Sequence, residues 1–338
     1  INEDEIGAVV PVDEEGLRWI FNLNWEAGEE FYDDISGERL DPELVRRARA
    51  EEMMEVRKHG LYEKRSIEEC VRMTGKKPVG VRWVDINKGD DENPNYRSRL
   101  VGKEFNTEPM EGLFAGTPPL EAMRYIIHEA ATIRSGEKMG SKVIMIHDVA
   151  RAFFEAPAMR NICIEIPKED LLEADKRLDK VGHLRMSLYG TRDAAMNWQE
   201  EVAKEMRKLW FERGRYNPCL YHHPGRNIEM LVHGDDFVFV AEDGELDWIQ
   251  ELVVGWFEVK VRGRIGPETE DSKSIRILNR IVEWTADGIR YEADQRHAEL
   301  IIMHLGLGSS KANASSVPGQ KRGPSDTSSE LLEPRHKD

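Results

Sequence analysis

The sequence lacks several features that would place it in a common class of protein. Its 338 residues include only three cysteines, Cys70, Cys163 and Cys219, which are far apart and form no CxxC pair. A disulfide framework and a cysteine-rich zinc site are therefore not expected, and a reducing compartment fits. No apolar run approaches the ~20 residues that span a membrane. The first residues are acidic and begin with Ile, so no secretory signal is visible, and the chain is interpreted as a fragment or a processed product.

An excess of positive charge is also missing. The chain holds 48 Lys and Arg against 64 Asp and Glu, a net charge of −16. That balance argues against a simple non-specific nucleic-acid binder, which would be basic overall. Residues 1–70 alone carry 20 acidic and 9 basic side chains. Much of the acidity is therefore an N-terminal property, and a basic groove in the middle of the chain remains compatible with it.

Several widespread catalytic patterns are absent. The sequence has no GxGxxG or GxxxxGK[ST] loop, no GxSxG element, and no cysteine with a convincing catalytic partner. Dinucleotide-binding, P-loop and serine-hydrolase interpretations thus lose their main support. The histidines show no HxxxH or HxH spacing, and His147 and His233 are interpreted as structural residues.

Local patterns predict irregularly mixed helices and strands. Asp41-Pro42-Glu43 is typical of a helix start, and the helix should run to about His59, with charges such as Arg49 and Glu52 on a solvated face. Alternation within 79–84 and 96–101 predicts a hairpin, and alternation at 162–166 predicts a strand. This order indicates an α+β class with an antiparallel sheet packed on helices. Residues 1–40 are expected to be a poorly ordered acidic leader, and residues 308–338 a disordered tail.

Carboxylates at the ends of apolar strands are the strongest candidates for chemistry. Asp148 follows the apolar run 143–147, and Asp235-Asp236 separates the apolar runs 228–232 and 237–240. An unpaired carboxylate beside a core is costly, and two neighbouring acids repel each other, so a bound cation is a natural partner. Oxygen ligands without cysteines favour Mg²⁺ or Mn²⁺. The alternative from spacing alone is that Asp148 caps a helix and Asp235-Asp236 forms an ordinary turn.

From about residue 43 to 307 the sequence resembles the reverse transcriptases of copia-type LTR retrotransposons. Six blocks carry the resemblance in order: VRWV with YRSRLVGK, TPP with RYII, DVARAFF with ICIEIP, SLYGTRDAAMNW, HGDD, and IRIL with a later GI. The chain departs from the family pattern at several positions. His233-Gly234 replaces Tyr-Val before the paired aspartates, Asp193 and Ala195 replace Gln and Pro, and Asn279 replaces Gly.

The resemblance implies a right-hand polymerase fold for residues 41–307. Fingers are expected at about 75–140, a palm with an antiparallel sheet at about 141–245, and palm with a partial thumb at about 246–307. The implied activity is RNA-directed and DNA-directed DNA synthesis from dNTPs on an RNA template with a DNA or RNA primer. No membrane partner is implied, and the protein would act inside the cell, in a cytoplasmic particle or the nucleus.

The resemblance also assigns roles to individual residues. Asp148 and Asp235 would hold two Mg²⁺ ions ~4 Å apart, with Mn²⁺ as a substitute, and Asp236 would act more peripherally. Phe153 would be the steric gate that excludes a 2′ hydroxyl, and its alternative role is core packing. The remaining expected nucleotide-binding residues are Arg97, Arg99, Lys103, Tyr189 and Gly190.

Two rival functions remain at this level. One is a catalytically decayed or domesticated nucleic-acid-binding remnant of the same fold, which the motif departures favour. The other is a metal-dependent phosphodiesterase that uses the same carboxylates.

Overall fold

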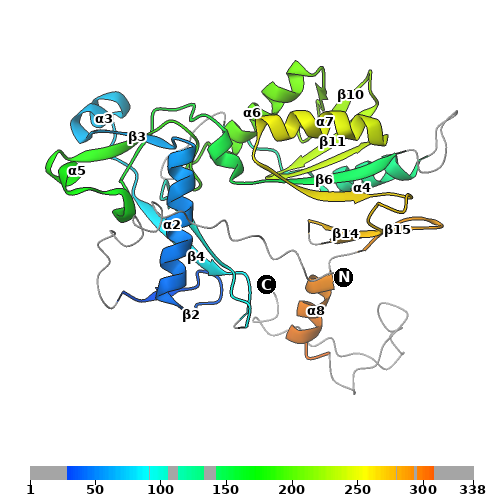
Figure 1. The fold of residues 1–338 in the computed structure, drawn as a ribbon, viewed down its shortest axis with the longest axis horizontal. Helices are drawn as coiled ribbons and strands as arrows, with labels where there is room; N and C mark the ends of the chain where they lie inside the picture. Colours follow the sequence, from blue (N-terminus) through cyan, green and yellow to red (C-terminus); the bar gives the residue numbers. More distant parts are fainter. Residues whose placement is uncertain are drawn as a thin grey trace, which may run out of the picture. The chain divides into compact units, whose positions relative to one another are not determined.

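The computed structural model describes residues 29–90, 92–105, 113–132, 142–278, 280–292 and 295–307. Most of the predicted leader and the whole predicted tail lie outside these residues. The chain divides into two compact units, one of residues 1–275 with 283–289 and one of residues 276–282 with 290–338. The candidate site lies in the first unit, which is a mixed structure of helices and antiparallel sheets (Figure 1).

A six-stranded sheet is the largest element of this unit. Its strand order is β13-β6-β12-β11-β10-β9, and every pairing in it is antiparallel, as the α+β interpretation requires. The neighbouring interior strands β6 and β12 are almost wholly apolar because they are covered on both faces. The strands are β6 (Val143–Val149), β9 (Glu212–Arg213), β10 (Leu220–His223), β11 (Ile228–His233), β12 (Asp236–Ala241) and β13 (Val259–Ile265).

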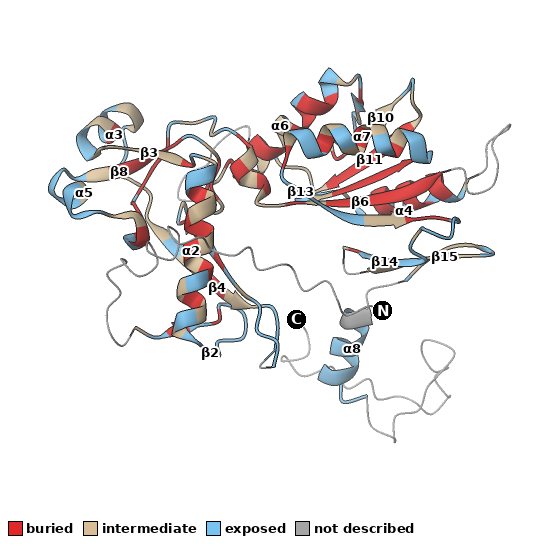
Figure 2. Cartoon of the chain, in the orientation of Figure 1, coloured by how far each residue is buried: buried red, intermediate tan, exposed pale blue. Residues whose placement is uncertain are grey.

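Helices cover both faces of this sheet and bury its strands (Figures 1 and 2). Helix α4 (Leu120–Ala131) lies on one face, with its apolar side chains at the expected helical spacing. Helices α6 (Ala194–Lys208) and α7 (Asp243–Trp256) pack on the other face, in a core that includes Trp198 and Phe237. The layered core holds the ends of β6 and β12 rigidly, and these are the strand ends that carry Asp148 and Asp236.

The N-terminal part of the unit is built around helix α2 (Pro42–Lys58), which begins as predicted. The Asp41 carboxylate accepts hydrogen bonds from the Glu43 and Leu44 amides at 2.8 and 3.0 Å. The predicted hairpin is confirmed as β4 (Val81–Asn87) paired with β5 (Tyr96–Gly102). The other elements here are β1 (Phe31–Tyr32), β2 (Arg39–Leu40), β3 (Tyr62–Ser66), α3 (Ile67–Thr74), η1 (Ala152–Glu155), β7 (Cys163–Ile164), η2 (Lys168–Asp170), α5 (Glu173–Arg177) and β8 (Lys180–Leu184).

The solvated face predicted for helix α2 is wrong for two of its charges. The Arg49 guanidinium donates to Asp85 at 2.6 Å and to Glu169 at 3.2 Å in a largely buried cluster. Glu52 is 2% exposed and accepts a hydrogen bond from Arg151 at 2.8 Å. Both side chains are buried because their partners arrive from distant parts of the chain, which a helical pattern cannot show.

Two further expectations need correction. Cys70 and Cys163 form a disulfide between α3 and β7, although their 93-residue separation gave no hint of pairing. The strand expected over 162–166 is only the two residues of β7. The alternating isoleucines do not mark one buried and one exposed face, because Ile162, Cys163 and Ile164 are all buried. Cys219 is buried and free.

The rest of the described chain forms one small sheet and one helix. The small sheet has three strands, β14 (Ser274–Ile277), β15 (Arg280–Thr285) and β16 (Gly288–Tyr291), in that order. Helix α8 covers Gln295–His304. Among the described residues, no helix combines the length and the apolar composition that membrane crossing requires.

Candidate active site

Three aspartates lie near one another where the ends of β6 and β12 lie side by side. Asp236, the first residue of β12, is the register partner of Asp148 on β6. Directly opposed residues of an antiparallel pair project to the same face, so these two carboxylates share one face of the sheet. Asp235 lies in the two-residue turn between His233 and Asp236, and it is exposed. The strand register thus pairs Asp148 with Asp236, whereas the resemblance pairs Asp148 with Asp235, and the expected metal pair stays a prediction.

The backbone of the aspartate turn is fixed from two sides. Gly234 has φ 62°, a conformation in which glycine carries no steric cost, as the first central position of a type II′ turn demands. The Val149 amide donates to the Asp235 carbonyl at 2.8 Å, which ties the turn to β6. The indole of Trp198 donates to the Gly234 carbonyl at 2.7 Å, and its buried ring stacks on Phe237. Trp198 thus links the packed core to the position of the turn.

The aspartates are electrostatically strained by one another. Burial, Asp235 and Asp148 together raise the pKa of Asp236 from 3.8 to about 6, while Arg262, 3.7 Å away, opposes the shift. His147, next to Asp148, is fully buried, and burial lowers its pKa to about 4, so the ring is neutral at pH 7. This agrees with a structural histidine. Burial and the two neighbouring carboxylates thus outweigh the attraction of Arg262 for ionised Asp236.

The donor set fits a hard divalent cation. Three carboxylates offer only oxygen ligands, and a cation between them would relieve the repulsion that raises the Asp236 pKa. The three aspartates do not form as compact a ligand group as Glu55, His59 and Glu258, whose donor atoms all lie within 4.8 Å of one another. In that group, however, the Lys58 ammonium already contacts both glutamates. The aspartate cluster is therefore the better candidate for a metal.

A prediction follows from the raised pKa of Asp236. Because its folded pKa of about 6 exceeds the ordinary value of 3.8, proton binding favours the folded state. The contribution of this group to the free energy of unfolding is greatest below pH ~4 and is lost as pH rises through 6. Asp236→Asn should raise the stability at pH 8 in EDTA by about 1–3 kcal/mol and leave it nearly unchanged at pH 4. Chemical denaturation at both pH values tests this, with the exposed Asp287→Asn as control. Equal effects at the two pH values would contradict it.

Several predicted nucleotide-binding residues gather around the Tyr189 ring. The Arg99 guanidinium lies 4.8 Å from the centre of this ring, and the Phe153 ring centre lies 4.6 Å from it. Burial is the main cause that raises the pKa of Tyr189 to about 12, with Asp235 among the charges that act on it. Phe153 is half-buried, whereas Phe154 is fully buried in the core. Phe153 is therefore the one of the pair that a ligand can reach.

The other three predicted residues occupy different positions. Arg97 lies on the same exposed face of β5 as Arg99. Lys103 lies farther along, beside Gly80 and Glu165. Gly190 has φ 78°, and a Cβ there would lie 2.1 Å from the Gly102 carbonyl oxygen. Gly190 thus allows a close backbone contact, and no side chain could replace it without moving β5.

Sequence reasoning missed three charged residues near this cluster. Arg151 follows Asp148 by three residues and has φ 48°. Its partner Glu52 is so buried that the pKa of this carboxyl is raised despite Arg151 and nearby Arg99. Burial, Arg97 and Arg99 lower the pKa of Lys88, and Asp235 and Asp148 act in the opposite sense. Of the three, only Arg151 could have been suspected from the sequence, since it follows Asp148 by three residues. The contacts of Glu52 and Lys88 depend on the fold.

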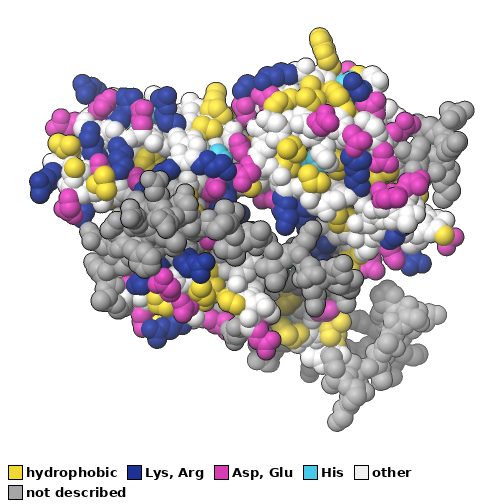
Figure 3. Space-filling model, viewed as in Figure 1, with side chains coloured by type: hydrophobic (Ala, Val, Ile, Leu, Met, Phe, Trp, Pro, Cys, Tyr) yellow, Lys and Arg dark blue, Asp and Glu magenta, His cyan; other side chains and the backbone are white. Residues whose placement is uncertain are grey.

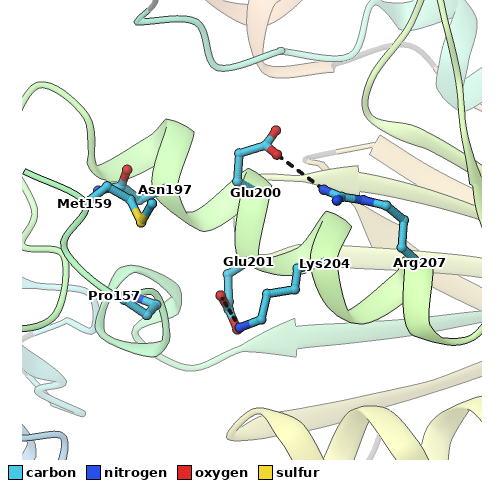
Figure 4. A pocket seen from close by; sticks show the side chains of 7 residues that line it. All are labelled: Pro157, Met159, Asn197, Glu200, Glu201, Lys204 and Arg207. Carbon is cyan, nitrogen blue, oxygen red and sulfur yellow. Dashed lines mark hydrogen bonds and ion pairs between the residues drawn. The ribbon is translucent and has the colours of Figure 1, made fainter.

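One pocket lies away from the aspartates. It has a volume of about 250 Å³ and is lined in part by helix α6 (Figure 4). Its Glu201 pairs with Lys204 at 2.7 Å, and its Glu200 pairs with Arg207 at 3.4 Å. These charges satisfy one another, so this pocket is a weaker candidate than the aspartate cluster.

Comparisons with known proteins agree with the resemblance. The chain is 25% identical over 205 residues to the retrovirus-related Pol polyprotein from transposon TNT 1-94 of Nicotiana tabacum. The match covers 58% of this chain and 14% of that protein. A structure of apo telomerase from Candida tropicalis, truncated from its C-terminal domain, aligns with 78% of this chain and 63% of its own length. Its sequence identity is 8% and its TM-score is 0.42, too low to establish a shared fold.

The family assignment rests on the longest match. Residues 69–266, more than half of the chain, match the family described as reverse transcriptase (RNA-dependent DNA polymerase). This range contains Asp148, Asp235 and Asp236, whereas Glu52 precedes it. The transposon relative supports the copia-type retrotransposon resemblance. The chain belongs to the reverse transcriptase family.

Proposed function

We propose that this chain is the polymerase part of a copia-like retrotransposon polyprotein. It would extend a primer 3′ hydroxyl with dNTPs on an RNA or DNA template. The observation that carries the proposal is the proximity of Asp148, Asp235 and Asp236. They lie at the ends of two adjacent strands inside the family match. The experiment that tests it is extension of a DNA primer on an RNA template.

The proposed site divides into a cation-binding part and a nucleotide-binding part. Asp148 and Asp235, with Asp236 beside them, would hold two Mg²⁺ ions, and Mn²⁺ could replace them. Such ions, when bound, increase the acidity of the primer hydroxyl and neutralise the charge on the leaving pyrophosphate. The protein supplies the rigid strand ends and the turn that Trp198 and Val149 hold in place.

Cations beside the aspartates suit the triphosphate of a nucleotide. Among the described residues, Lys88, Arg97 and Arg99 make no ion pair, and they are close enough for like-charge repulsion to lower the Lys88 pKa. Unpaired cations crowded together favour a bound anion. The Phe153 and Tyr189 rings, which contact each other, offer an apolar surface to the sugar. This division of roles matches a nucleoside triphosphate better than an uncharged ligand.

Phosphodiester cleavage by the same carboxylates is the weaker alternative. A hydrolase needs the metal-binding acids but has no use for a steric gate. Phe153 stands at the position where the family resemblance places that gate, and Tyr189 supports its ring. The half-exposed aromatic pair therefore favours a nucleotide-selecting polymerase.

We propose that the β4–β5 hairpin contacts the template–primer backbone despite the acidic total. Residues 72–103 carry 8 basic and 4 acidic side chains, of which the hairpin itself, residues 81–102, holds four of each. On the hairpin, Arg97 and Arg99 lie on one exposed face of β5. Over α3 and α5, on the face drawn in Figure 3, basic and acidic side chains are interspersed. The hairpin is therefore the better candidate for a phosphate contact.

Binding to template–primer should weaken steeply with salt. Each phosphate contact releases counterions, so for three or four contacts the logarithm of the association constant should fall with the logarithm of the salt concentration with a slope of about −3. Fluorescence anisotropy between 50 and 300 mM KCl measures it. Arg97→Gln should make the slope shallower by about one, whereas Arg185→Gln, outside the hairpin, should not. Affinity that does not change with salt would count against this surface.

A further inference from the structure

The loop that carries Tyr189 and Gly190 is anchored by a charge network centred on Arg160. The guanidinium binds the Glu104 carboxylate with two hydrogen bonds, of 3.1 and 2.9 Å, and donates to Asp193 at 2.6 Å. Asp193 is only 1% exposed. One arginine from the segment after η1 therefore joins the end of β5 to the start of α6.

The same carboxylates also bind the loop itself. Glu104 accepts a hydrogen bond from the Arg192 amide at 2.8 Å. Asp193 accepts one at 3.1 Å from the Asn197 amide group, which also donates to the Ser187 hydroxyl at 3.1 Å. Both ends of the 187–193 loop are thus tied to the network. The loop centre is tied to β5, because the Gly102 amide donates to the Tyr189 carbonyl at 2.7 Å.

The network keeps its charges although it is largely buried. Burial opposes ionisation of both acids, yet the Arg160 guanidinium holds the pKa of Asp193 and of Glu104 below their ordinary values. Buried ion networks add little net stability compared with apolar packing, but they require one arrangement of their partners. Since Asp193 stands where the family pattern has Gln, this ion pair is a feature of this chain rather than of the pattern.

The consequence for the site passes through two aromatic rings. The network fixes the loop, the loop fixes Tyr189, and the Tyr189 ring lies 4.6 Å from the Phe153 ring. Phe153 is only half-buried, so its ring depends on Tyr189 for lateral support. Displacement of Tyr189 would give the Phe153 ring room to move away from a 2′ hydroxyl.

We propose that Arg160 is a positioning residue for sugar selection, which holds Tyr189 against Phe153 through its bonds to Glu104 and Asp193. The proposal rests on the proposed function, in which Phe153 excludes ribonucleotides. It adds that the strength of this exclusion is set by an ion network that touches neither the sugar nor the metals.

Arg160→Lys tests the role of the forked geometry. Lysine keeps the positive charge but cannot bind Glu104 with two parallel hydrogen bonds and Asp193 at once. Equilibrium binding of dATP and ATP to the protein–template–primer complex is measured with Ca²⁺ in place of Mg²⁺. The Kd ratio of ATP to dATP should fall by about tenfold, because small displacements of positioning groups have large effects on selection. The affinity for dATP should change by less than about threefold.

A matched control and a second variant keep the test decisive. Arg264 bridges Asp243 and Asp247 at 2.9 and 2.6 Å, and Arg264→Lys should leave the ratio unchanged. If Arg160→Lys melts below the assay temperature, Glu104→Gln removes one charge of the network at a more exposed position and should lower the ratio in the same way. An unchanged ratio in the folded variant, or an equal loss of affinity for both nucleotides, would overturn the proposal. Because this readout needs no turnover, wild-type protein that discriminates but does not extend a primer would contradict only the proposed function.

Discussion

Asp235→Asn is expected to reduce Mg²⁺-dependent primer extension by on the order of 10³-fold or more, with almost no change in folding. The loss follows because an amide is a poor, uncharged substitute for a carboxylate in holding a divalent cation. Folding should be nearly unaffected because Asp235 is exposed in its turn, and surface substitutions of this kind change the free energy of unfolding by ~0.5 kcal/mol or less. Single-turnover extension and thermal denaturation of the same preparation measure both effects.

The control for this prediction is another exposed aspartate. Asp287→Asn, in the turn between β15 and β16, should extend the primer at the wild-type rate. Asp236→Asn should have a smaller effect on extension than Asp235→Asn if Asp236 has the more peripheral role that the family resemblance implies, although the strand register places Asp236 opposite Asp148. Retention of a near-wild-type rate by Asp235→Asn would show that the catalytic assignment is wrong.

Phe153→Val is expected to lower the preference for dNTPs over rNTPs by about 10- to 100-fold. A planar ring beside the sugar excludes a 2′ hydroxyl by steric clash, and valine leaves room for it. The incorporation ratio of dNTP to rNTP is measured by single-nucleotide extension. Phe153→Tyr, which retains the ring, should keep the ratio.

Packing alone would give a different result for Phe153. The side chain contacts the core, so its truncation should also reduce stability by about 1–3 kcal/mol whatever its role. Stability therefore does not distinguish a steric gate from a packing residue, whereas the ratio of dNTP to rNTP incorporation does. A lower melting temperature with an unchanged ratio would make Phe153 a packing residue.

Elements governed by local interactions were predictable from the sequence. Asp41 and Pro42 mark the start of helix α2 because capping depends only on neighbouring backbone amides. The β4–β5 hairpin follows from alternation on both sides of a polar turn. Asp148 and Asp235 were identified because a carboxylate at the end of an apolar strand has an unusual environment. The expectation that they share one site came from the family resemblance, since strand order is not a local property.

What could not be predicted depends on contacts between distant segments. Arg49 and Glu52 resemble surface residues of a helix, and they are buried only because Asp85, Glu169 and Arg151 meet them. The disulfide between Cys70 and Cys163 likewise depends on the fold, which brings the two cysteines together. Strand β13 was missed because polar side chains and a bulge near Gly263 interrupt its alternation.

The network around Arg160 shows the same limit at the candidate site. The sequence marks Asp193 only as a departure from the family pattern, which taken alone suggests decay. In the structure this acid is buried and paired with Arg160 at 2.6 Å. The burial and pairing of Asp193 can be recognised only from its three-dimensional neighbours.

The central claim is that this chain synthesises DNA on an RNA template, and one measurement tests it most directly. A 5′-labelled DNA primer annealed to an RNA template is incubated with the purified wild-type chain, four dNTPs and Mg²⁺. The account predicts products that reach the template end, that follow the template sequence when single dNTPs are omitted, and that disappear with EDTA. A folded protein that binds the template–primer but adds no nucleotide in either Mg²⁺ or Mn²⁺ would contradict the account and favour a nucleic-acid-binding remnant of the family.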